Sequence, residues 1–255
     1  MDYFVSKNSI IRKIWGKSDT VLFIFVGSAA EFALNKAVDW LYFTGRLPSD
    51  PLGRLFSTVT YAHHIFFSDK AGALMAIDKM AAIHAKVEDN RGAAIPDWAY
   101  RDVLFMLIDY SIRAYELLER KLTNAEKQEV CQVFLQVGQR MGLVGLPTNY
   151  REWLPMREQH LHKDLVNSHY TSDLYQQYKK HLGLFRYIIL KQAQLLLVPK
   201  RVSELLGLGR ITFIKPIVFA YKLSRSLKLD GIVKNSILPD TYKSEIKNLD
   251  KMPAY

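Results

Sequence analysis

The segment that follows Pro96 constrains the fold more than any other, because its middle part is apolar on every side. It reads WAYRDVLFMLIDYSIRAYELLERKL after Asp97, and no polar residue interrupts the run from Val103 to Ile108. A helix that is apolar all round is typical of the centre of a protein rather than its surface. The sequence therefore predicts one long helix, beginning near Asp97, that is buried at the centre of the fold.

Helical periodicity continues on both sides of this segment. Residues 71–89 place apolar side chains and His84 at steps of three and four, which are successive positions on one helical face. Thr123 and Glu126 form a capping-box sequence, and the helix that they open would direct inward Val130, Val133, Phe134, Val137 and Met141. Further helices are expected at 151–167, 172–182, 184–198 and 200–206, with a weaker one at 213–229 broken by Pro216 and a short closing one at 241–250. Alternation of β-branched residues is nearly absent, so we predict an all-α fold with little or no sheet.

The length predicts a single domain over residues 1–255. A chain of 255 residues can bury one large core, and no low-complexity linker divides it. The composition is 49% hydrophobic and 24% charged, which argues against disorder. Cys131 is the only cysteine, so no intrachain disulfide can form; its apolar neighbours indicate a buried and inert thiol.

The N-terminal sequence favours a cytoplasmic protein. It lacks an apolar stretch followed by a small-residue cleavage site, so no signal peptide is expected. The apolar run Val21–Ala30 stops at Glu31, well short of the roughly 20 apolar residues that a membrane-spanning helix needs. We therefore expect no transmembrane segment.

The formal net charge of +10 calls for an explanation of its own. Basic residues are concentrated between Lys200 and Lys228, but no helix-turn-helix, zinc or aromatic RNA-binding pattern accompanies them, so a nucleic-acid partner is not expected. A solvated helix surface is the favoured interpretation. Peripheral contact with an anionic membrane remains the alternative.

Three residues could carry chemistry. Arg54 and Thr58 lie four positions apart in PLGRLFSTVTYAHH, so a helix beginning at Pro51 would place them on one face. His84 follows 26 positions after Thr58, within an apolar stripe. Each residue also has a purely structural interpretation: an arginine can pair with a carboxylate, a threonine can bond to the preceding turn, and a histidine on an apolar face is commonly a core residue with one hydrogen bond to a carbonyl. The alternative for His84 is an axial ligand of haem iron, with Ala81 and Ala85 leaving room for a flat macrocycle.

A family resemblance adds to these observations. The order Asp-Pro-Leu-Gly-Arg-Leu-x-x-Thr, then Ile-His-x-x-Val, then a long apolar helix ending in Arg-Ala-Tyr-Glu and a Leu-Thr-x-x-Glu cap resembles the MpaB-type oxygenase family, which includes rubber oxygenases of the latex-clearing type. The landmarks are strongest over residues 50–150. Characterised members are all-helical b-type haem proteins that use dioxygen to cleave carbon–carbon double bonds in isoprenoid chains.

The resemblance implies a role for each candidate residue. His84 would be the axial ligand of a haem b iron in a haem-sized pocket, and Arg54 and Thr58 would stand near the distal side, steering dioxygen or holding the motif in shape. The chain departs from the family pattern in two places: the segment 31–50 contains no histidine, and Ser57 stands where rubber-cleaving members have a lysine. We therefore expect a divergent member, a haem-dependent oxygenase acting on an isoprenoid or lipid-like substrate. A non-catalytic helical protein that binds haem or lipid is the alternative.

Two further groups of histidines do not predict a site. His160 and His162 are two positions apart and would diverge on a helix, so they are interpreted as a polar surface. His63 and His64 are adjacent and cannot both face one site; His64 is the weaker alternative for an iron ligand. No Glu-x-x-His pair of the diiron type occurs.

Overall fold

A computed structural model describes residues 2–45, 49–209 and 211–226 of the chain, and within them every regular element is a helix. The only β-type pairing among these residues is two isolated bridges, so the predicted all-α fold is confirmed. The helices are α1 Ile10–Trp15, α2 Ser18–Phe32, α3 Asp39–Phe43, α5 Pro51–Phe67, α6 Lys70–Arg91, α7 Asp97–Leu118, α8 Asn124–Arg140, α9 Tyr150–Lys163, α10 His169–Leu197, α11 Lys200–Leu206 and α12 Lys215–Ser226.

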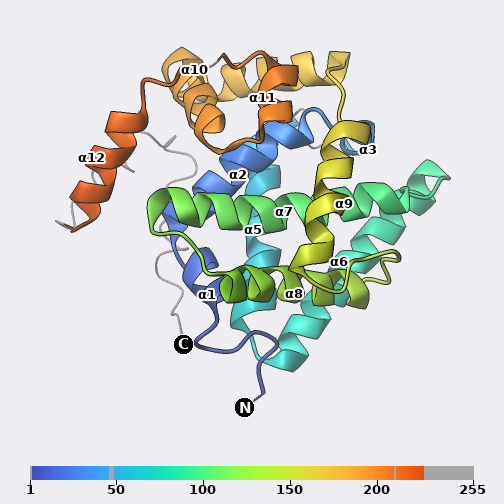
Figure 1. Cartoon of the computed structure of the whole chain (residues 1–255). Coiled ribbons are helices and arrows are strands. Elements are labelled where there is room, and N and C mark those ends of the chain that lie inside the picture. Colours follow the sequence, from blue (N-terminus) through green and yellow to red (C-terminus); the bar gives the residue numbers. More distant parts are fainter. Residues whose placement is uncertain (1, 46–48, 210, 227–255) are drawn as a thin grey trace.

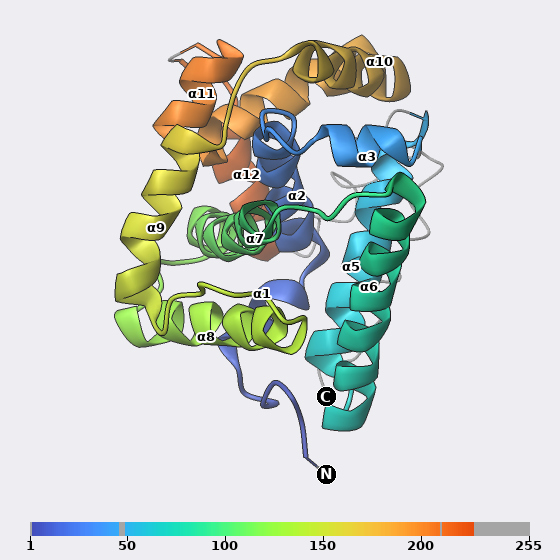
Figure 2. The same cartoon turned by 90° about the vertical axis from the view of Figure 1, so that its right-hand side faces the viewer.

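The predicted central helix is α7, which Figure 2 shows almost end-on in the middle of the molecule. It packs most extensively against α2. The two helices approach closely at Gly27 of α2, where a Cβ atom would come within 2.3 Å of the Tyr110 ring. Phe105 and Ile108 are fully buried, as expected. Val103 differs, because it is 36% exposed and lines the cavity described below.

The remaining helices surround this pair on four sides. In Figure 2, α9 stands on one side of α7, the neighbouring helices α5 and α6 stand on the other, α8 lies below, and α10 runs across the top. The helix α12, at the left of Figure 1, packs against α2 and the end of α7: Val218 is buried there, and Tyr221 donates to Asp19 at 3.0 Å. No helix in the described part of the chain combines the length and the apolar character needed to cross a bilayer.

Helix ends follow the local sequence. The capping box predicted for α8 is confirmed: the Glu126 N–H donates to Thr123 Oγ1 at 3.2 Å, and the Thr123 N–H donates to the Glu126 carboxylate at 2.9 Å. Asp69 caps α6 by accepting from the Gly72 N–H at 2.8 Å. The helix ends at Gly92, whose left-handed φ of 67° is a conformation that glycine adopts without strain.

The C-terminal half follows the sequence prediction with one difference. The two helices expected at 172–182 and 184–198 are the two parts of α10, which is interrupted at Gly183, where φ 73° and ψ 166° are not helical. Pro216 does not break a helix, because it lies in the first turn of α12, where proline needs no N–H partner. The helix expected at 200–206 is confirmed as α11. The helix predicted at 241–250 lies outside the described residues.

Candidate functional site

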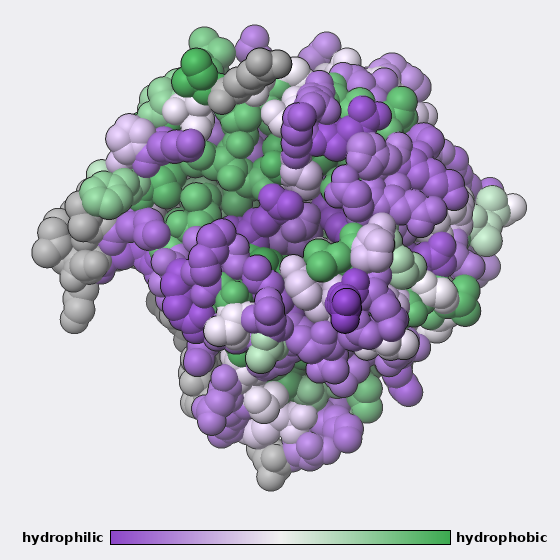
Figure 3. Space-filling model, viewed as in Figure 1, coloured by the Kyte–Doolittle hydropathy of each residue, from purple (hydrophilic) through white to green (hydrophobic). Residues whose placement is uncertain are grey.

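A cavity of about 1150 Å³ runs along one side of the central helices. Its wall includes residues of both α6 and α12, which lie on opposite sides of the molecule in Figure 1, so the cavity is elongated. Figure 3 shows apolar residues lining a hollow between α10 and α12. The exposed face of Val103 belongs to this wall. The volume is above the range of roughly 300–1000 Å³ that is usual for small-molecule sites, so it has room for a large ligand.

His84 reaches this cavity from α6. The residue is half-buried, and its Nδ1 lies 2.9 Å from the Met80 carbonyl oxygen one turn earlier. A neutral imidazole that donates from Nδ1 carries its lone pair on Nε2. The ring also meets the Tyr100 ring edge-on, with the two ring centroids 5.4 Å apart. The orientation of the imidazole is therefore set by contacts to α6 and α7.

Tyr100 is itself fixed by Glu88. Its hydroxyl donates to Glu88 Oε1 at 3.1 Å, and the same oxygen accepts from the Ile95 N–H at 2.8 Å. Burial, followed by the charge of Glu88, raises the pKa of the Tyr100 phenol, so this side chain stays protonated. The contact between His84 and Tyr100 thus rests on a hydrogen-bonded connection between α6 and the start of α7.

Thr58 lines the same cavity from α5 and is half-buried. This helix begins at Pro51, and Asp50 caps it by accepting from the Gly53 N–H at 2.8 Å, so the start predicted for it is confirmed. Because α5 packs against α6, Thr58 and His84 contribute to one wall. Arg54 belongs to α5, one turn before Thr58, but its side chain lies outside the described part of the structure.

The adjacent histidines of α5 face different surroundings, as their spacing predicts. His64 is exposed, so it does not suit an interior ligand. His63 is buried and stacks on Phe67, with ring centroids 4.8 Å apart, and it does not line the cavity. Burial lowers the pKa of His63 to about 4, although a backbone contact with Trp15 acts in the other direction.

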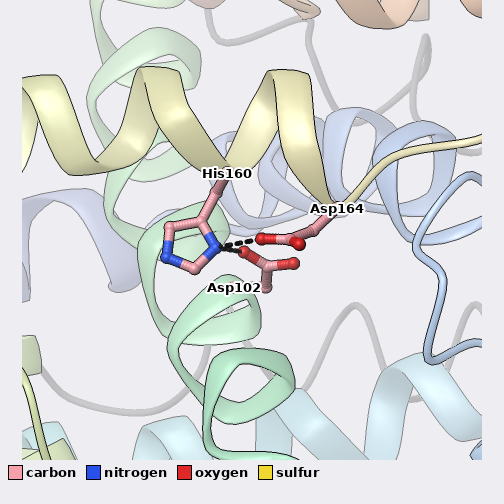
Figure 4. A group of neighbouring side chains, drawn as sticks. All are labelled: Asp102, His160 and Asp164. Carbon is pink, nitrogen blue, oxygen red and sulfur yellow. Dashed lines mark ion pairs between the residues drawn. The ribbon is translucent and has the colours of Figure 1, made fainter.

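The prediction of a polar surface at His160 and His162 is wrong for His160. That side chain is buried, and His162 alone is exposed, where it contacts Glu158. Figure 4 shows the carboxylates of Asp102 from α7 and Asp164 from the end of α9 converging on one nitrogen of His160. The Nδ1 atom lies 2.8 Å from Asp164 Oδ2 and still closer to Asp102 Oδ1.

Neighbouring residues hold the side chains of the Asp102–His160–Asp164 cluster in place. Asn35 donates to Asp102 Oδ2 at 2.8 Å, and its own carbonyl oxygen accepts from the Ala37 N–H, also at 2.8 Å. The ring of Phe105 packs edge-on against the imidazole. Burial, and then the charge of Asp102, raise the pKa of the Asp164 carboxyl. The cluster lies on the α9 side of α7, whereas His84 lies on the cavity side.

A second buried polar layer joins α2, α7 and α9. Arg157 makes two parallel bonds to the carboxylate of Glu31, each 2.5 Å long, and also contacts Asp109 at 3.1 Å. The other oxygen of Asp109 accepts from Arg113 at 2.7 Å, and Tyr110 donates to Glu31 at 3.0 Å. Two carboxylates are thus balanced by two guanidinium groups. Glu31 is held in this layer and does not line the cavity.

Comparison with known proteins identifies the class of this chain. The sequence model of the family described as "ER-bound oxygenase mpaB/B'/Rubber oxygenase, catalytic domain" matches residues 15–216. This match covers well over half of the chain, including α10 and α11, whose likeness the sequence motifs did not establish. The chain therefore belongs to the MpaB/rubber oxygenase catalytic-domain family. No curated protein and no solved structure matches it significantly.

Proposed function

We propose that this protein is a haem b-dependent oxygenase that acts with dioxygen on an apolar, isoprenoid or lipid-like substrate. The observation that carries the proposal is the position of His84, whose imidazole lines a large apolar cavity with Nδ1 directed to a backbone carbonyl. Histidines that bind metals in proteins usually donate their second ring nitrogen to such an acceptor. The family of oxygenase catalytic domains supports the same chemistry.

The residues present fit a haem group in this cavity. His84 would hold the iron through Nε2, while Met80 and Tyr100 keep the ring in one orientation. Lys86 also lines the cavity and offers a cation for a carboxylate group of the ligand. Haem supplies the oxygen chemistry when it is bound, because no amino-acid side chain activates dioxygen in this way.

The remaining roles belong to the wall of the cavity. Apolar side chains of α2, α7 and α10 would bind a hydrocarbon substrate and exclude water from it. The hydroxyl of Thr58 would donate a hydrogen bond to an oxygen-bearing group in the cavity. Arg54 lies one turn away in the same helix, and we assign it the task of strengthening that polar end with its positive charge.

An absorption spectrum tests the cofactor. The full chain, purified with haem supplied, should show a Soret band at one haem per chain. The variant His84→Ala should lose or strongly shift this band, while His64→Ala, which removes an exposed histidine of the neighbouring helix, should leave it unchanged. No Soret band after reconstitution would remove the haem proposal, and an unchanged spectrum in His84→Ala would show that another residue holds the iron.

Oxygen consumption separates an enzyme from a carrier. We expect the haem-loaded protein to consume dioxygen in the presence of an unsaturated isoprenoid or lipid. Thr58→Val and Arg54→Gln should slow this consumption while retaining the Soret band. If haem binds through His84 but no unsaturated substrate is oxidised, the protein is a haem- or lipid-binding member of the family without turnover.

A further inference from the structure

The Asp102–His160–Asp164 cluster takes no part in the chemistry proposed for His84, because none of its three residues lines the cavity, and hydrogen bonding does not account for it. The three ligand-type atoms lie within 4.8 Å of one another, and each residue is more than nine-tenths buried. Asp102 Oδ1 and His160 Nδ1 point at each other, yet neither atom has a hydrogen-bond partner among the described residues. A single Nδ1 carries at most one proton, so it cannot satisfy two carboxylates at once.

The charge of the cluster is also unbalanced. In the second buried layer, here called the Arg157 layer, the carboxylates of Glu31 and Asp109 face the two arginines Arg113 and Arg157. In the described part of the chain, no lysine or arginine forms an ion pair with Asp102 or Asp164. Two carboxylates therefore face a single imidazole in this cluster. Buried charges without a partner are costly, so the Asp102–His160–Asp164 cluster calls for a further cation.

We propose that Asp102, His160 and Asp164 bind a divalent transition-metal ion. One imidazole nitrogen and two carboxylate oxygens are ligands that suit Zn²⁺, Mn²⁺ or Fe²⁺, with water completing the coordination. Ca²⁺ and Mg²⁺ prefer oxygen ligands alone, so the imidazole favours a transition metal over both. Asn35 orients Asp102 through its other oxygen, which is the usual outer support of a metal-binding carboxylate.

The position of the cluster suggests a structural role for the metal. Asp164 is the C-cap of α9, and Asp102 lies near the start of α7. A shared ion would therefore fasten the end of α9 to the central helix. The Arg157 layer fastens the middle of α9 to α7, and the ring of Phe105 lies between the two layers, in contact with both Trp153 and His160 of α9.

Metal analysis of the untagged, haem-free full chain tests the proposal. After chelation and equilibrium dialysis against Zn²⁺, the wild type should retain one zinc ion per chain, and Ca²⁺ should not replace it. Asp102→Asn and His160→Gln should each lower zinc affinity by about tenfold or more. Zinc should also raise the midpoint of thermal unfolding of the wild type but not of Asp164→Asn, a conservative variant whose fold circular dichroism verifies.

The matched control is His162→Gln, two residues further along α9 and exposed. It should retain zinc as the wild type does, and so should His84→Ala, because the cavity is a separate site. The proposal is overturned if the wild type retains no zinc. It is equally overturned if Asp102→Asn and His160→Gln retain zinc as well as the wild type, since the ion would then be bound elsewhere.

Discussion

The two sides of the central helix α7 are built on opposite principles. Towards α9, Asp102, Phe105 and Asp109 face a closed interface, in which Asp102 lies against His160 and Asp109 against Arg157. Towards the cavity, Tyr100 and Val103 face open space with one imidazole in its wall. The closed side fixes the position of the helix, and this leaves the other side able to keep a large apolar cavity without collapsing. Stability and binding are thus assigned to different faces of one helix.

The largest test of this comparison is Arg157→Met, on the closed side. The change leaves Glu31 buried without its bidentate partner and Asp109 with Arg113 alone. Breaking a buried pair in this way costs about 3–5 kcal/mol of the free energy of unfolding, which urea denaturation measures. The control is Arg140→Met, whose pair with Asp78 is half exposed, and it should have hardly any effect. Equal effects of the two variants would show that the buried layer does not hold α9.

The second test concerns His63, a buried histidine without a carboxylate partner in the described residues. Its pKa is about 4 in the folded protein against 6.5 in the unfolded chain, because burial disfavours the charged ring. Between these values the unfolded state binds the additional proton, so stability rises with pH and is complete above 6.5. The contribution is up to about 3 kcal/mol.

Comparison of His63→Leu with the wild type isolates that contribution. The variant should lose less stability than the wild type as the pH falls from 6.5 to 4, as measured by urea unfolding at each pH. His64→Leu, at the exposed neighbouring position, should keep the wild-type pH dependence. Identical pH profiles of His63→Leu and the wild type would mean that His63 is not buried neutral.

These histidines also show what the sequence could and could not predict. His84 was predicted to face inward because its neighbours at steps of three and four are apolar. His160 was missed because its partners come from another helix and from the end of its own, and the nearby His162 suggested a polar surface. A signal was present: Trp153, Arg157 and His160 share one face of α9, and a tryptophan marks the buried face.

The helices themselves were predictable where local chemistry decides. The capping box at Thr123 set the start of α8, and the apolar run of α7 marked the centre of the fold. The break at Gly183 within α10 was predictable too, since helices were expected at 172–182 and 184–198. The cavity could not be predicted, because apolar residues that line a cavity and those that fill a core have the same composition.

A third test compares a valine that lines the cavity with a valine that is buried in the core. Val103→Phe adds volume where the cavity has room, so the free energy of unfolding should stay close to that of the wild type. Val130→Phe adds the same volume at a fully buried position of α8, where overpacking costs about 1–3 kcal/mol. Equal losses would mean that the cavity wall is packed like the core. Retention of an apolar probe, which Val103→Phe should reduce, checks that the same space is used for binding.

The smallest expected effects come from replacing a tyrosine by phenylalanine on each side of α7. Tyr110→Phe removes a 3.0 Å hydrogen bond to Glu31, but both oxygens of that carboxylate still accept from Arg157, so none is left without a partner. The loss should therefore be about 1 kcal/mol. Tyr100→Phe removes a bond to the half-buried Glu88, which water can replace, and the loss should be smaller. A larger loss of stability in Tyr100→Phe would contradict this comparison. The cavity side of α7 would then contribute the stability that we attribute to the interface with α9.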